Sequence, residues 1–181
     1  YIGVLIDDLV TKGTKEPYRM LTSRCEYRLL LRHDNVDRRL CPISRKLGLM
    51  DDQKWYPMVD KWQRIDREIE RLDQVKLRPG EEINLELEAR GSSPLKESIP
   101  ASVLLSRPDV DYRMVEKFLP SSEGLNPDEI MSVSVEIKYK GYIDRQKRQV
   151  RKLDRMEKVP IPDDFDYSRI PGLLTESRQK L

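Results

Sequence analysis

The chain has 181 residues, 38% of them hydrophobic and 36% charged, with 34 basic and 32 acidic side chains. This length allows one domain or two small ones, and so high a charge content favours exposed helices over a β-sandwich. The near-neutral total excludes a globally basic field, so any basic function requires local clusters. No apolar run approaches the roughly 20 residues that a membrane-spanning helix needs.

The residue types that carry chemistry are scarce. Cys25 and Cys41 are the only cysteines, no CxxC pair occurs, and His33 is the only histidine. This inventory predicts neither a zinc site nor a disulfide framework, and it favours a reduced, cytoplasmic setting. We expect Cys25 to lie in the core and His33 on the surface. Because no dinucleotide-binding, Walker A, HExxH or GxSxG motif occurs, we expect no self-contained active site.

Residues 1–10 form a short apolar run rich in β-branched side chains, for which a strand and a buried helix both stay open. The chain has no initiator methionine. We therefore expect it to be a piece of a longer protein, with a neighbour that covers this run. Residues 11–15 are expected to form a loop.

Residues 17–40 hold six arginines, three of which stand four residues apart: Arg24, Arg28 and Arg32. This spacing predicts a helix with an arginine stripe on one face and Leu21, Cys25 and Leu29 on another. Ser23 and Glu26 fit a capping box at its start, and a turn is expected around Asn35. The stripe is either a solvated face paired with carboxylates or a surface for phosphates, and its spacing does not decide between them.

The middle of the chain predicts several helices. One should occupy 41–47 and end at Gly48, and a long one should begin at Asp51 or Asp52 and run to about Leu77, with its charged residues on an outer face. Residues 83–89 alternate as a strand does, but their glutamate and leucine content favours a short helix. Shorter helices are predicted at 100–105 and 110–119, between proline-containing breaks.

Asn126 and Pro127, followed by two acids, predict a strong helix start. This helix should run to about Lys158, before Pro160. Basic residues outnumber acidic ones across 138–158, and Tyr139 and Tyr142 lie at the head of that stretch. A further helix is expected at 173–181.

Two basic surfaces are therefore candidates for phosphate binding, with tyrosines that could stack on unpaired bases. The candidate residues are Arg24, Arg28, Arg32, Arg38, Arg39, Lys138, Lys140, Tyr142, Arg145, Arg148, Arg151, Lys152 and Arg155.

The chain closely resembles the C-terminal part of the tRNA uridine-5-carboxymethylaminomethyl modification enzymes, the MnmG or glucose-inhibited division protein A family. The resemblance extends in order across nearly the whole chain. It rests on residues 1–9, 22–24, 26–29, 34–35, 37–40, 91–92, 94–95, 104–105, 107–108, 139, 141–143, 145–146, 166–167, 170, 172–173, 176 and 180–181. Departures are small: Cys25 and Val36 stand where the family pattern has alanine, and Leu174 where it has serine.

The resemblance implies a mainly α multi-helix bundle at the C-terminal end of a larger enzyme that uses FAD, NADH and a methylene-tetrahydrofolate carbon donor. With a GTPase partner, MnmE, such an enzyme would modify the wobble uridine of tRNA. Its cofactor-binding and catalytic residues would lie upstream of Tyr1. The whole enzyme would be a homodimer. This part would bind tRNA and the GTPase, or would dock the GTPase without touching RNA.

The resemblance also implies a division of the chain. Residues 1–40 would end the FAD domain and form a junction helix. Residues 41–125 would form a helical subdomain, and residues 126–181 a long basic helix with the start of a C-terminal subdomain.

Overall fold

The computed structural model describes residues 1–121 and 123–160, together with residues 165, 172, 174 and 176. The chain divides into two compact units, Tyr1–Gln146 and Lys147–Leu181. The described part is mainly helical, which confirms the predicted fold class. The subdivision at residues 40 and 125 stays a prediction, and the helix predicted at 173–181 lies largely outside the described residues.

The N-terminal run forms helix α1, Ile2–Thr11. It is neither a strand nor a buried helix, because Asp8 is its only buried residue. The chain then turns through residues 12–16, where a loop was predicted.

The predicted arginine-striped helix is wrong. Only a 3₁₀ turn, Thr22–Arg24, forms there, and Cys25 is extended behind it. In the following turns the Leu30 amide donates to the carbonyl of Tyr27, three residues back, as in a tight turn. The Arg32 guanidinium donates to the Leu29 carbonyl, and the side-chain amide of Asn35 donates to the Leu30 carbonyl. These side chains occupy acceptors that a continuing helix would need, and the predicted Ser23 capping box does not form.

Helices α2, Val36–Lys46, and α3, Asp52–Gln74, follow. After α2 the amide of Leu49 donates to Ser44 and that of Gly48 to Arg45, and Gly48 has φ 72°. This Schellman arrangement needs a residue that tolerates positive φ, so the predicted stop at Gly48 is confirmed. Asp51 caps α3 by accepting from the Lys54 amide, as predicted.

Helix α3 ends three residues earlier than predicted because the chain extends into a strand. Strand β1, Lys76–Leu77, pairs antiparallel with β2, Ile99–Pro100, and Leu77 lies opposite Ile99. The sequence analysis missed this short ladder, since two residues carry no period-two pattern. It closes the loop that contains α4, Glu81–Ala89, whose helical prediction is confirmed.

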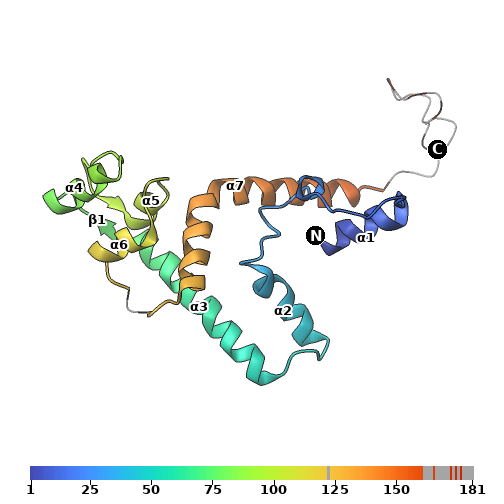
Figure 1. Ribbon diagram of the computed structural model, residues 1–181, viewed down its shortest axis with the longest axis horizontal. Helices are drawn as coiled ribbons and strands as arrows, with labels where there is room; N and C mark the ends of the chain where they lie inside the picture. Colours follow the sequence, from blue (N-terminus) through green and yellow to red (C-terminus); the bar gives the residue numbers. More distant parts are fainter. Residues whose placement is uncertain (122, 161–164, 166–171, 173, 175, 177–181) are drawn as a thin grey trace. The chain divides into compact units, whose positions relative to one another are not determined.

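The core of the first unit lies where α3 to α6 and the start of α7 meet. Helices α5, Ala101–Leu105, and α6, Tyr112–Phe118, follow β2, and both were predicted. Figure 1 shows α4, α5 and α6 grouped around β1 near one end of α3. The buried aliphatic residues at the centre are Leu72, Leu87, Leu104, Leu105, Val110 and Val133.

Helix α7, Pro127–Glu157, begins and ends where the sequence predicts. The side chain of Asn126 accepts from the Glu129 amide at 3.0 Å, and the Glu129 carboxylate accepts from the Asn126 amide at 2.9 Å. This reciprocal capping box fixes the first turn. No helix among the described residues has the length and apolarity to cross a bilayer.

Candidate nucleic-acid interface

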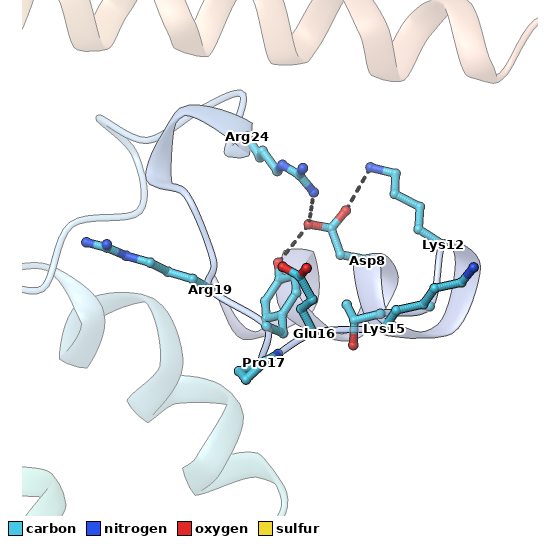
Figure 2. A pocket seen from close by; sticks show the side chains of 10 residues that line it. Asp8, Lys12, Lys15, Glu16, Pro17, Arg19 and Arg24 are labelled. Carbon is cyan, nitrogen blue, oxygen red and sulfur yellow. Dashed lines mark hydrogen bonds and ion pairs between the residues drawn. The ribbon is translucent and has the colours of Figure 1, made fainter.

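Arg24 is held by an aspartate. The buried carboxylate of Asp8 accepts from Arg24 Nη1 at 2.6 Å, from the Tyr18 hydroxyl at 2.7 Å and from Lys12 Nζ at 2.8 Å (Figure 2). Donation by Lys12, followed by Tyr18 and Arg24, holds the pKa of Asp8 far below its ordinary range. The guanidinium of Arg24 stays half-exposed, but it already forms an ion pair with Asp8. Arg24 therefore ties the 3₁₀ turn back to α1.

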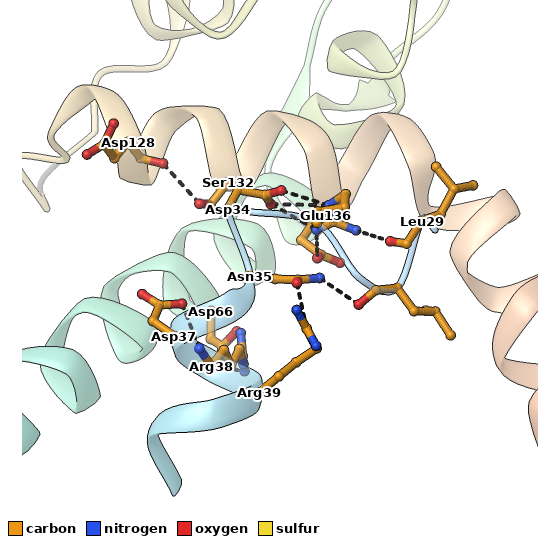
Figure 3. A network of polar contacts seen from close by, with 12 residues as sticks. Leu29, Asp34, Asn35, Asp37, Arg38, Arg39, Asp66, Asp128, Ser132 and Glu136 are labelled. Carbon is orange, nitrogen blue, oxygen red and sulfur yellow. Dashed lines mark hydrogen bonds and ion pairs between the residues drawn. The ribbon is translucent and has the colours of Figure 1, made fainter. Parts of the chain in front are cut away.

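Arg32 is the one arginine of the five candidates in this segment that binds two carboxylates among the described residues. Its Nε and Nη2 form a fork on Asp34, at 2.9 and 3.0 Å, and Nη2 also donates to Glu136 Oε1 on α7 at 2.6 Å (Figure 3). The side chain of Arg32 is only 12% exposed and that of Asp34 8%. Burial lowers the pKa of Arg32, yet donation to Asp34 and Glu136 outweighs it and leaves that pKa raised. Arg32 is a structural cross-link between the turn segment and α7.

Arg38 and Arg39 also have partners. Arg38 makes two parallel bonds to Asp66 on α3, at 2.8 and 2.6 Å, and Arg39 Nε donates to Asn35 at 2.9 Å. Arg28 differs from them, since it is exposed and its side chain forms no hydrogen bond or ion pair within the described part of the chain. The carboxylate-paired interpretation of this segment therefore fits three of its five candidate arginines, Arg24, Arg32 and Arg38, although Arg32 is largely buried and not solvated.

The candidates on α7 within the first unit differ in their exposure and in whether they have a partner. Lys138 Nζ donates to the carbonyl of Val110 at 2.7 Å and so anchors α7 to the start of α6. Lys140 lies 3.4 Å from Asp73 and is well exposed. Tyr142 is 63% exposed, and its ring centroid is 6.5 Å from that of Tyr139. Arg145 is exposed and has no partner among the described residues.

The candidates in the second unit share one property: they are exposed cations with no carboxylate partner in the part of the chain that the structure describes. Arg148, Arg151, Lys152 and Arg155 form no ion pair among the described residues. At 100° per residue they occupy an arc of roughly 100° on α7. Together with Met156 and Val159 they line a shallow groove. We call these four residues the basic face.

The chemistry of the basic face suits the binding of an oxyanion. Guanidinium groups offer planar, permanently charged forks to phosphate oxygens. A cation that already donates to a carboxylate must give up that bond first, whereas the basic face has no such bond to any residue that the structure describes. By this criterion the basic face is the strongest candidate surface.

The cysteines and histidine behave as predicted. Cys25 is buried and Cys41 half-buried, each as a free thiol, and His33 is exposed. Burial, with the nearby charge of Asp37, raises the pKa of the Cys41 thiol, which disfavours the thiolate. No group of three potential ligands in the described residues could hold a metal ion.

The sequence analysis missed three buried carboxylates among the described residues: Asp8, described above, Glu68 and Glu129. Glu68, predicted on the outer face of α3, is fully buried and accepts from Arg71 at 2.7 and 2.8 Å and from the Tyr112 hydroxyl at 2.7 Å. Burial, and then the bond to Glu68, raises the pKa of Tyr112 to about 12. Glu129, also buried, bonds to Arg64 on α3 as well as capping α7. The available signals were Arg71 three residues after Glu68 and the Asn126–Glu129 spacing.

The comparisons with known proteins agree with one another. Residues 52–147 match the family model described as the tRNA modifying enzyme MnmG/GidA C-terminal helical domain. The MnmG proteins of Latilactobacillus sakei and Geobacillus thermodenitrificans, named tRNA uridine 5-carboxymethylaminomethyl modification enzymes, are 50% and 48% identical to the whole chain. The chain spans 29% of the length of either relative.

The solved structure of Aquifex aeolicus GidA in its form II crystal is similar over 99% of the chain, at 34% identity and a TM-score of 0.68, and the match covers 28% of that protein. The matched family model includes α3 to α6 and most of α7. The fold, the order of the elements and the sequence relationships thus lead to one conclusion: this chain belongs to the MnmG/GidA family of tRNA-modifying enzymes and corresponds to its C-terminal part.

Proposed function

We propose that this chain is the tRNA-binding and partner-binding helical region of an FAD-dependent enzyme. With the GTPase MnmE, that enzyme installs the carboxymethylaminomethyl group at C5 of the tRNA wobble uridine. The observation that carries the RNA part is the basic face, Arg148, Arg151, Lys152 and Arg155, with no carboxylate partner among the described residues. The names of the relatives supply the substrate class, since each is called a tRNA uridine modification enzyme.

The chemistry of the basic face fits the RNA backbone better than the bases. Phosphate contacts from arginine and lysine supply affinity and orientation without reading sequence. Such a surface would hold the body of a tRNA while the uridine is modified elsewhere in the longer protein. Tyr142, exposed beside Tyr139, is our candidate for stacking on an unpaired base.

The remaining parts of the proposal rest on the family relationship. FAD and NADH would bind outside this chain, which lacks the glycine-rich dinucleotide motif. We assign none of its residues to those cofactors or to the carbon donor. We also propose that the whole enzyme is a cytoplasmic homodimer.

The test is a salt series of tRNA affinity measured by gel shift. In Arg148→Ala/Arg151→Ala we expect the slope of log affinity against log salt to flatten by about two, one for each lost phosphate contact. Between about 50 and 200 mM salt, the wild type should then lose roughly tenfold more affinity than the variant. The matched control is Arg38→Ala/Arg90→Ala, which removes two exposed arginines that already pair with carboxylates. The proposal fails if the two variants flatten the slope equally, or if neither changes it.

A second candidate is a protein-docking module that meets an acidic surface of the GTPase and touches no RNA. It is favoured by the exposed apolar side chains Met156 and Val159 within the same groove. Copurification of the partner that survives RNase, together with no tRNA gel shift, would select this function.

A further inference from the structure

Helix α2 carries an exposed aliphatic stripe. Its members are Val36, Leu40, Ile43 and Leu47, and each has 42% or more of its surface exposed. Their spacing of four, three and four residues is that of the a and d positions of a helix that packs along another helix. We call these four residues the α2 stripe.

The α2 stripe faces away from the neighbour that α2 already has. Polar groups join α2 to α3: Asp37 accepts from Lys61 at 2.7 Å. Arg38 forms its fork on Asp66 (Figure 3). Cys41 and Arg45, on the other side of the helix, are partly covered. A surface helix ordinarily turns its apolar side to its own domain, and α2 does the reverse.

Helix α1 repeats the pattern. Ile2, Ile6 and Leu9, spaced by four and three residues, are exposed, while the helix buries a carboxylate, Asp8. Two helices of one unit thus expose aliphatic stripes to solvent while each makes ion pairs and hydrogen bonds with its own fold. Contiguous apolar surface of this kind marks an interface, whereas aliphatic residues scattered singly do not.

We propose that the α2 stripe is an intramolecular docking surface, covered in a polypeptide of the relatives' length by the part that precedes this region. The occupant follows from two observations. The matched family model is a C-terminal domain, and this chain accounts for 29% of the length of its relatives, so most of such a polypeptide lies on the N-terminal side. The inference rests on the family membership behind the proposed function, but not on RNA binding.

The experiment compares one double substitution in two settings. Leu40→Ser/Ile43→Ser is made in the 181-residue chain and in the full-length gene product, and thermal unfolding is followed in both. We expect no loss of stability in the short chain, where serine replaces exposed aliphatic surface, and a fall of several degrees in the full-length protein. Leu85→Ser/Val103→Ser, at exposed positions of α4 and α5, is the control and should behave alike in both settings.

Hydrogen exchange of the unsubstituted proteins gives a second readout that does not depend on how the variants fold. The amides of residues 36–47 should exchange more slowly in the full-length protein than in the short chain. Equal exchange, or an equal effect of the serines in both settings, overturns the proposal. Sedimentation equilibrium that shows a dimer of the short chain, dissociated by the serines, assigns the stripe to a second copy and also overturns it. A full-length protein that keeps the stability difference but binds no tRNA would reject the proposed function and leave this inference standing.

Discussion

The arginines of residues 24–39 and the cations of the basic face look alike in the sequence but occupy different environments. Arg24, Arg32 and Arg38 each donate to a carboxylate of the same unit, and Arg32 reaches two. Arg148, Arg151, Lys152 and Arg155 have no such partner in the described residues. Spacing in the sequence therefore identifies a charged face. The location of the acidic side chains decides whether that face stabilises the fold or is left to bind a ligand.

The largest expected effect is on the stability of the first unit. Arg32→Ala should lower the free energy of unfolding by about 3 kcal/mol, because it leaves the nearly buried Asp34 without its partner. Urea unfolding measures the loss. The matched substitution in the basic face, Arg148→Ala, should stay within about 0.5 kcal/mol of wild type, because its side chain is exposed and unpaired. Equal losses for the two would contradict the distinction between the regions.

A second effect concerns how the stability contributed by Asp8 depends on pH. The pKa of Asp8 is lowered in the folded chain, so its contribution to stability is present above its ordinary pKa of 3.8 and is lost as pH falls toward the folded value. Unfolding midpoints of the wild type should therefore fall below about pH 4. In Asp8→Asn this component of the acid dependence should be absent, and an unchanged pH profile would show that Asp8 is not held by its three donors.

The stability contributed by Tyr112 has the opposite dependence on pH. Its pKa is raised to about 12 from 10.0, so its contribution is complete below pH 10 and is lost as pH rises from 10 to about 12. The difference in unfolding free energy between the wild type and Tyr112→Phe should shrink by roughly 2 kcal/mol across that window. A difference that stays constant with pH would argue against the bond from Tyr112 to Glu68.

The smallest effect concerns Arg38, which is paired but exposed. A double-mutant cycle with Arg38→Ala and Asp66→Ala should give a coupling free energy of about 0.5 kcal/mol, which salt reduces, because solvent screens both side chains. A coupling free energy as large as the loss expected for Arg32→Ala would mean that exposure does not determine how much these ion pairs contribute to stability.

The sequence predicted elements whose signals are local. Asp51, Gly48 and the Asn126–Glu129 pair each act within one turn, and each begins or ends a helix where predicted. The segment from 23 to 32 went wrong because its outcome depends on distant partners. Asp8, 16 residues before Arg24, and Glu136, 104 residues after Arg32, hold these arginines outside a helix.

The candidate site shows the same limit. The sequence placed the basic residues of α7 on one helix, but it left open whether the arginines of residues 24–39 face carboxylates or phosphates. The burial of Glu68 also depends on Tyr112 and Ser121, more than 40 residues away, so its helical position alone could not predict it.

The most direct test of the central claim measures stability and tRNA affinity together in two double variants of equal charge change. Arg24→Ala/Arg38→Ala removes paired arginines, and Arg148→Ala/Arg151→Ala removes unpaired ones. We predict opposite profiles: the first variant loses stability and keeps the salt dependence of tRNA binding, and the second keeps its stability and flattens that dependence by about two. A first variant that weakens tRNA binding as much as the second would contradict the account.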